Sequence, residues 1–174
     1  MTDRKEGDEL LESLTRVGEA IRGACSKQIG VLDSSFLCQS LSVLKCQEPE
    51  MVAPTASLRS VVEMLRARSI GCVLVGDSTG KLLGIFSERD LLVKALVADP
   101  VPWDEPIERF MTAEPVAEMP TTTVAFALTL MSQGGFRHLP LIDQDGVPIG
   151  IVSIKDIVDF IVSTLMQDLE GLEA

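Results

Sequence analysis

Two short stretches of this chain pair a serine with an aspartate three residues later. The first reads GIFSERD (residues 84–90) and the second GIVSIKD (residues 150–156), so Ser87 precedes Asp90 and Ser153 precedes Asp156. A hydroxyl can donate a hydrogen bond to a phosphate, and a carboxylate can accept hydrogen bonds from the two hydroxyls of a ribose. At the start of a helix, where unpaired amides favour an anion, such a pair suits a nucleoside phosphate.

The same pairs also have a purely structural interpretation. A serine at the N-cap accepts a hydrogen bond from the amide three residues on, and an acid at that position reaches back to the N-cap amide. Such capping stabilises a helix by about 0.5–2 kcal/mol and needs no ligand. The residue types alone leave both interpretations open.

Both stretches belong to an internal repeat. A shift of 66 residues lays residues 44–96 on 110–162 without a gap, and ten of the 53 aligned pairs are identical. In each copy, an apolar helical face (residues 58–65 and 124–131) follows a candidate N-cap, Ser57 or Thr123. The agreement of identity with periodicity indicates a true duplication.

The order of elements within each copy predicts the fold class. Two apolar runs joined by a glycine-containing turn predict a hairpin, and a second helix follows at residues 88–98 and 154–166. An extended piece before the first helix, MVA or VAEM, could add a strand. We therefore expect an α/β fold of the α+β type, in which two tandem β-α-β-β-α repeats pack with pseudo-twofold symmetry behind a helical N-terminal extension.

The expected domain boundaries follow from the repeat. We assign residues 1–38 to the N-terminal extension, 39–100 to the first repeat and 101–174 to the second, with the proline-rich residues 99–106 as a short, stiff connector. In the extension, Leu10, Leu14, Val17 and Ile21 share one helical face. A repeat of about 60 residues buries too small a core to be stable by itself, so we expect the two copies to pack together.

Composition and charge exclude several classes of function. With a net charge of −11, the chain is poorly suited to nucleic acid or to an anionic membrane surface, since both require clustered Lys and Arg. The four cysteines have no CxxC spacing and there is one histidine, so we expect no metal site and interpret the cysteines as core residues or free thiols. Without a signal-peptide or spanning segment, we expect a cytoplasmic protein.

The ordered motifs resemble those of the cystathionine-beta-synthase-type (CBS) domain family, and the tandem pair resembles its Bateman module. The second copy carries MTAEP (111–115), FRHLPLID (136–143) and GIVSIKD; the first carries the looser KCQEP (45–49), IGCVLVGD (70–77) and GIFSERD. The resemblance implies a regulatory or sensor module that binds an adenine nucleotide or adenosyl ligand in the crevice between its repeats. AMP, ADP or ATP are the foremost candidates, with S-adenosylmethionine or NAD as others.

The resemblance also implies the roles of individual residues. Asp90 and Asp156 would bind ribose, whereas Ser87, Ser153, Arg137 and His138 would bind phosphate. The residues expected close to the adenine are Pro49, Met51, Pro115, Val116 and Ala117.

The two implied sites differ in charge. The first copy has Gly71 and Cys72 where the second has Arg137 and His138, so it lacks their positive charge, unless Arg68 or Lys81 compensates. Glu50 and Glu118 would repel a bound phosphate. We therefore expect unequal sites, with the one near Arg137 favoured for anionic ligands.

No catalytic pattern accompanies these residues. The chain lacks GxSxG, Walker A and HExxH patterns, so we expect neither enzymatic activity nor a catalytic cofactor. The resemblance implies a bacterial-type stand-alone module that forms a homodimer, for which the apolar helical face from Ile157 to Leu165 is a candidate contact. The alternative is a ligand-free structural or dimerisation module that recruits a protein partner, with the Ser–Asp pairs serving only as caps.

Overall fold

The computed structural model describes residues 28–29 and 32–170, and the predicted N-terminal helix therefore lies outside the described residues. Contacts divide the chain into two compact units, each assembled from separate stretches of sequence. One unit takes residues 47–119 and 140–151; the other takes residues up to 46, residues 120–139 and those from 152 onward. Each unit therefore contains residues from both repeats. The predicted boundaries of the three domains stay a prediction.

The first repeat supplies most of a four-stranded sheet in the unit of residues 47–119 and 140–151. Its strands are β3 (Met51–Val52), β4 (Cys72–Gly76), β5 (Leu82–Ser87) and β6 (Thr112–Ala113), hydrogen-bonded in that order. β3 pairs parallel with β4, and β4 and β5 form the predicted antiparallel hairpin. β6 is contributed by the start of the second repeat and pairs antiparallel with β5. β3 is the extra strand predicted for the segment MVA, and that prediction is confirmed.

The second repeat reproduces this arrangement in a shorter form. β7 (His138–Ile142) and β8 (Pro148–Ser153) form the second hairpin. Single bridges flank it: Glu118 pairs parallel with Leu141, and Gln47 pairs antiparallel with Ile151. Shifting the Val52–Val75 pair by 66 residues gives the Glu118–Leu141 pair, so the internal repeat of the sequence is also a repeat of strand register.

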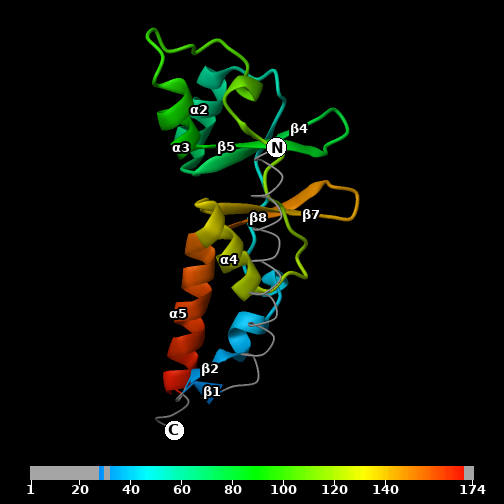
Figure 1. Ribbon diagram of the computed structural model, residues 1–174, viewed down its shortest axis with the longest axis vertical. Helices are drawn as coiled ribbons and strands as arrows, with labels where there is room; N and C mark the ends of the chain where they lie inside the picture. The colour runs from blue at the N-terminus through cyan, green and yellow to red at the C-terminus, as the bar shows by residue number, and fades with distance from the viewer. Residues whose placement is uncertain (1–27, 30–31, 171–174) are drawn as a thin grey trace, which may run out of the picture. The chain divides into compact units, whose positions relative to one another are not determined.

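Helix α2 (Leu58–Arg68) covers the sheet of the first repeat, as its apolar spacing predicts (Figure 1). Leu58, Val61 and Leu65 are buried in one core with Phe86 of β5. The predicted N-cap is also confirmed, since the Ser57 hydroxyl accepts a hydrogen bond from the Ser60 amide at 3.2 Å. The proline-rich connector is held to this helix, because the amides of Leu58 and Arg59 donate to the carbonyls of Glu105 and Trp103 at 2.9 Å.

The helix that follows β5 differs from its prediction. A single α-helix was expected over residues 88–98, but α3 covers only Glu88–Asp90, and the next residues, Leu91–Ala95, form a turn of π-helix, η3. The reason is visible in the hydrogen bonds: the Leu96 amide donates to the carbonyl of Leu91, five residues back, at 2.9 Å. This widened turn ends the helix early and leaves Leu92, Val93 and Val97 exposed.

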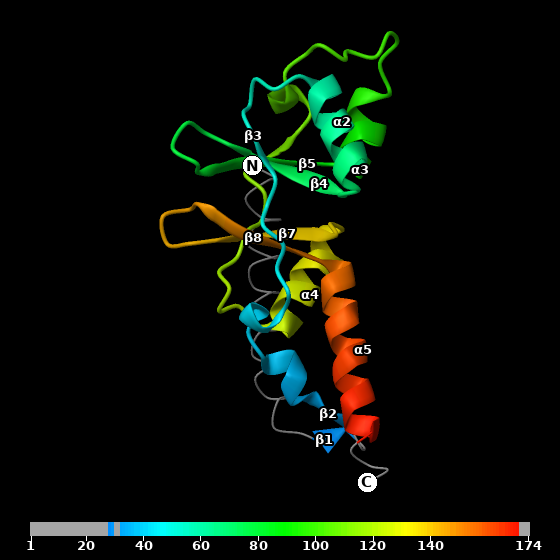
Figure 2. The same cartoon turned by 180° about the vertical axis from the view of Figure 1, so that it is seen from behind.

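The second repeat keeps its predicted helices. α4 (Val124–Gly134) begins after the N-cap Thr123, and α5 (Ile154–Glu170) begins at the end of β8. The two helices lie side by side, as the views in Figures 1 and 2 show. The predicted apolar face of α5 is divided: Ile157 is buried, whereas Val158 and Val162 are about half exposed.

The thiols follow the sequence expectation only in part. Cys46 and Cys72 are free, whereas Cys38 is disulfide-bonded. The expectation of free or core thiols is therefore wrong for Cys38, because spacing along the chain does not show which sulfur atoms approach one another in space.

The turns of the two hairpins share one geometry. Asp77 accepts hydrogen bonds from the amides of Thr79 and Lys81 at 2.7 and 3.0 Å, and Asp143 likewise from those of Asp145 and Val147 at 2.9 Å. Gly80 and Gly146 follow with φ of 85° and 82°, a region that a side chain disfavours. These two glycines recur in the repeat because the turn requires a positive φ.

Replacing Gly146 with Ala isolates this backbone requirement, since a Cβ at Gly146 would have no neighbour within 4 Å. We expect Gly146→Ala to lower the free energy of unfolding by about 1–2 kcal/mol through strain alone. Urea denaturation measures the change, with Gln144→Ala in the same turn as the matched control. An unchanged unfolding midpoint for Gly146→Ala would contradict this account of the turn.

Candidate functional site

The Ser87–Asp90 corner lies where β5 ends and α3 begins. The Ser87 hydroxyl donates to Asp90 Oδ2 at 2.6 Å, the Ser87 amide donates to the same oxygen at 2.9 Å, and the Asp90 amide donates to Ser87 Oγ at 3.3 Å. This is the reciprocal capping box that the structural interpretation predicts. The arrangement leaves Asp90 only 8% exposed, the one buried charged residue of the described chain.

The other carboxylate oxygen of Asp90 is also occupied. Lys94 Nζ lies 2.7 Å from Oδ1, and the Thr112 hydroxyl donates to Oδ1 at 3.1 Å. Lys94 in turn donates to Thr112 Oγ1 at 2.8 Å. Burial alone would raise the pKa of Asp90, but the hydrogen bonds from Lys94 and Ser87 outweigh it and lower the pKa below its ordinary value. Asp90 is therefore held as a carboxylate.

The Ser153–Asp156 corner repeats the cap between β8 and α5. The Ser153 hydroxyl and amide donate to Asp156 Oδ2 at 2.6 and 2.7 Å, and the Asp156 amide donates to Ser153 Oγ at 3.2 Å. Here the described hydrogen bonds to the carboxylate all fall on Oδ2. The helix that begins at this corner has 17 residues, so the positive end of its dipole lies at its first turn.

The backbone also brings the cationic candidates to the second corner. The Ile154 amide donates to the carbonyl of Arg137 at 2.9 Å, which ties the start of β7 to the start of α5. Arg137 is exposed and His138 is half-buried. In the first repeat the same bond joins the Glu88 amide to Gly71 at 3.1 Å, so Gly71 and Cys72 lie where Arg137 and His138 lie in the second. The backbone positions of the two corners are therefore equivalent, and the expected inequality of the two sites stays a prediction.

The cations proposed to compensate in the first repeat are engaged or distant. Arg68 pairs with Glu50, so its charge is balanced by the glutamate that was expected to repel a phosphate. Lys81 lies at the hairpin turn, where its amide donates to Asp77. Neither Arg68 nor Lys81 has a described bond to the Ser87–Asp90 corner.

The residues predicted near the adenine are not brought to either corner by any hydrogen bond within the described chain. Pro49, Pro115 and Ala117 are half-buried, whereas Val116 and Met51 are exposed. Their role stays a prediction.

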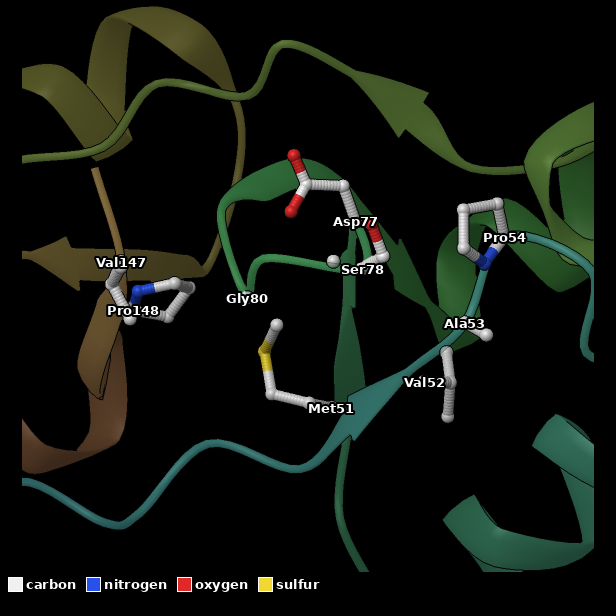
Figure 3. Close-up of a pocket in the computed structure, with 10 residues that line it drawn as sticks. Met51, Val52, Ala53, Pro54, Asp77, Ser78, Gly80, Val147 and Pro148 are labelled. Carbon is white, nitrogen blue, oxygen red and sulfur yellow. The ribbon is translucent and has the colours of Figure 1, made fainter. Parts of the chain in front are cut away.

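Met51 instead lines a separate apolar hollow of about 540 Å³ (Figure 3). The hollow lies beside the hairpin turn, away from the Ser–Asp end of β5, and Gly76 permits the Met51 methyl group to lie over the strand. Its walls come from the end of β3, the first hairpin turn and the second hairpin: Met51, Val52, Ala53, Pro54, Gly76, Asp77, Ser78, Gly80, Val147 and Pro148. The lining offers no buried charged side chain.

Sequence reasoning missed three residues at the corners. Lys94 could have been found, because the i, i+4 spacing from Asp90 places both side chains on one helical face. Thr112 could not, since 22 residues separate it from Asp90. Cys46, the counterpart of Thr112 after the 66-residue shift, lies within electrostatic reach of Asp156 and was equally hidden.

Within the described residues, no group of three or more His, Cys, Asp or Glu side chains is placed to hold a metal ion. None of the helices in that part of the chain is long and apolar enough to cross a bilayer.

A family model described as "CBS domain" matches this chain twice, at residues 44–96 and 107–163. Among curated proteins, an uncharacterized 17.7 kDa protein of Acidianus ambivalens is 35% identical over 107 residues, which cover 62% of this chain and 63% of that relative. The chain spans less than two thirds of the length of the first curated relatives that it matches.

Two solved structures share the fold. The CBS domain protein PAE2072 from Pyrobaculum aerophilum, complexed with AMP, is 25% identical, with a TM-score of 0.62 over 67% of this chain and 88% of that one. The CBS domain pair of protein MJ0100, in complex with 5′-methylthioadenosine and S-adenosyl-L-methionine, is 22% identical, with a TM-score of 0.66 over 72% of this chain and 98% of that one.

The Cys46 thiol provides a reporter of the second corner. Its partial burial and then the Asp156 carboxylate raise its pKa above the ordinary value, so thiolate forms only at higher pH. We expect Asp156→Asn to lower the pKa of Cys46 and to speed alkylation by iodoacetamide at pH 8, since each pKa unit changes the thiolate fraction about tenfold.

Mass spectrometry of alkylated peptides between pH 7 and 9.5 follows this reaction at Cys46 directly. Cys72 is the internal control, because burial and then the nearby Asp90 and Glu88 raise its pKa to about 12 and should keep it unreactive. Identical rate profiles for Cys46 in the wild type and in Asp156→Asn would show that the carboxylate does not act on the thiol.

Proposed function

Because this chain belongs to the CBS domain family and carries two CBS domains in tandem, we propose that it is a regulatory module that binds an adenine nucleotide or another adenosyl ligand. CBS pairs of the same fold are complexed with AMP in one relative and with 5′-methylthioadenosine and S-adenosylmethionine in another. The feature common to these ligands is an adenosine with its ribose diol. AMP, ADP and ATP are the foremost candidates for this chain, with S-adenosylmethionine and NAD as alternatives.

One observation carries the proposal: the Ser153–Asp156 corner combines an acid, a hydroxyl, a helix start and a cation. Asp156 uses Oδ2 for its cap, and Oδ1 is the acceptor that it would offer to ribose hydroxyls. The positive end of the α5 dipole suits a phosphate, to which the Ser153 hydroxyl would donate its hydrogen in place of Asp156 Oδ2. Arg137, tied by its carbonyl to the start of α5, adds positive charge, and His138 follows it in β7.

In this proposal, capping by Asp156 and ribose binding by Asp156 are compatible. A cap occupies one carboxylate oxygen and leaves the other to a ligand, because a carboxylate offers about four lone-pair positions. The two interpretations of the Ser–Asp pair are therefore not exclusive. Adenine contacts by Pro49, Met51, Pro115, Val116 and Ala117 remain part of the proposal.

The proposed module acts by binding and not by catalysis. A ligand shifts the equilibrium between two arrangements of a protein only by its different affinity for them. Binding or release of an adenosyl ligand at Asp156 would therefore shift the module between its two arrangements. The protein that the module controls would respond to that shift. The proposal places the protein in the cytoplasm, where adenine nucleotides are abundant, with a protein target still to be identified.

A thermal-shift panel of AMP, ADP, ATP, NAD and S-adenosylmethionine tests the proposal. A ligand present at 100 times its dissociation constant should stabilise the fold by about 2.7 kcal/mol. We expect Asp156→Ala to remove that stabilisation while the protein stays folded, since the lost cap costs about 1 kcal/mol. Asp159→Ala, which removes an exposed acid from the same helix, should keep the full shift. If no ligand moves the wild-type midpoint, the ligand-free alternative replaces this proposal.

We further propose that the module is a homodimer that associates through α5. Val158, Val162 and Met166 are spaced four residues apart and are 48%, 47% and 57% exposed, which forms one apolar stripe along the helix. A second copy of the chain could bury both stripes against each other.

Light scattering coupled to size-exclusion chromatography measures this association. We expect the wild type to have the mass of a dimer and Val162→Glu to have that of a monomer, because a buried charge in an apolar contact is costly. Ser163→Glu, which adds the same charge at the neighbouring exposed position, is the matched control. A monomeric wild type would refute the proposed dimer without affecting ligand binding.

A further inference from the structure

Asp90 differs from Asp156 in the number of donors that it already satisfies. Oδ2 accepts from the Ser87 amide and hydroxyl, and Oδ1 accepts from Lys94 and Thr112. Four donors match the capacity of a carboxylate. A ribose diol would need two acceptor positions on Asp90, and both oxygens are already engaged by the protein itself.

The residues that close this corner are absent from the other repeat. After the 66-residue shift, Lys94 corresponds to Phe160 and Thr112 corresponds to Cys46. A phenyl ring has no donor, and a thiol is only a weak one. The difference in the hydrogen bonding of the two carboxylates therefore lies in these two substitutions and not in the Ser–Asp pairs, which are identical.

The Lys94–Asp90 pair is also better protected from water than the other lysine pair on a helix. The side chains of Lys94 and Asp90 are 35% and 11% exposed, whereas those of Lys155 and Asp159 are 78% and 60% exposed. Exposed pairs at this spacing exchange readily with water and contribute little. The Lys94 ammonium is in addition held by Thr112 at 2.8 Å, which fixes its position against the carboxylate.

We propose that Lys94 is an internal competitor that occupies the Asp90 corner, so that each chain binds one adenosyl ligand, through Asp156. The inference rests on the proposed adenosyl-binding function and adds its stoichiometry. Because Lys94 is covalently tethered four residues from Asp90, a free ligand competes against a group at high effective concentration. A ligand at this corner must also do without the cation that Arg137 offers at the other, since Gly71 stands in its place.

Native mass spectrometry with AMP and with 5′-methylthioadenosine, each titrated separately, counts the ligands per chain. 5′-Methylthioadenosine has the ribose diol but no charge. Replacing Lys94 therefore removes no charge–charge attraction between the protein and this ligand. We expect one ligand per wild-type chain, two molecules of 5′-methylthioadenosine per Lys94→Met chain, and one per chain when Lys94→Met is combined with Asp156→Ala. Lys155→Met, which breaks the exposed lysine pair, is the matched control and should bind one.

The outcomes separate this inference from the function on which it rests. Two ligands on the wild type, or no second ligand on Lys94→Met and on Lys94→Gln when both melt as folded proteins, would overturn the inference and leave the function standing. No ligand on any variant would refute the function and the inference together. A second ligand gained by Lys94→Met and lost again with Asp90→Ala would support the inference, whereas a wild type that bound none would overturn its stoichiometry.

Discussion

The carboxylate of an aspartate bonded to the serine three residues before it is the interaction on which both strand-to-helix corners depend. It satisfies an amide that would otherwise lack a partner at the end of a strand, and it fixes where the next helix begins. Because the aspartate is held by one oxygen, the direction of its second oxygen is fixed by the backbone. The capping interaction, which needs no ligand, therefore positions the carboxylate oxygen that a ligand at these corners would contact.

What surrounds the second oxygen decides how the two corners differ. At Asp90, Lys94 and Thr112 complete the hydrogen bonding and bury the charge. At Asp156, an aromatic residue and a thiol stand at the corresponding positions, and the adjoining strand begins beside Arg137. A duplicated corner has thus become an ion pair in one repeat and a candidate binding corner in the other, with the cap itself unchanged.

The hairpin turns keep the same backbone geometry in both repeats, although several of their side chains differ. Asp77 and Asp143 make the same side-chain bonds to the turn, and each turn needs a glycine at positive φ. The Leu82 amide also donates to the Gly146 carbonyl at 3.2 Å, which joins the start of β5 to the second turn.

The sequence by itself determined the duplication, the hairpins, the N-caps Ser57 and Thr123 and the buried faces of α2 and α4, because each rests on contacts between residues close in the chain. It also identified the Ser–Asp corners as candidate sites, though not their inequality in full. Only the tertiary structure brought Thr112 to Asp90 and Cys46 towards Asp156, placed β6 of the second repeat on the sheet of the first, and widened the turn after Asp90 into a π-helix. These features join residues far apart in the chain or depend on packing around a turn, and local periodicity carries no information about either.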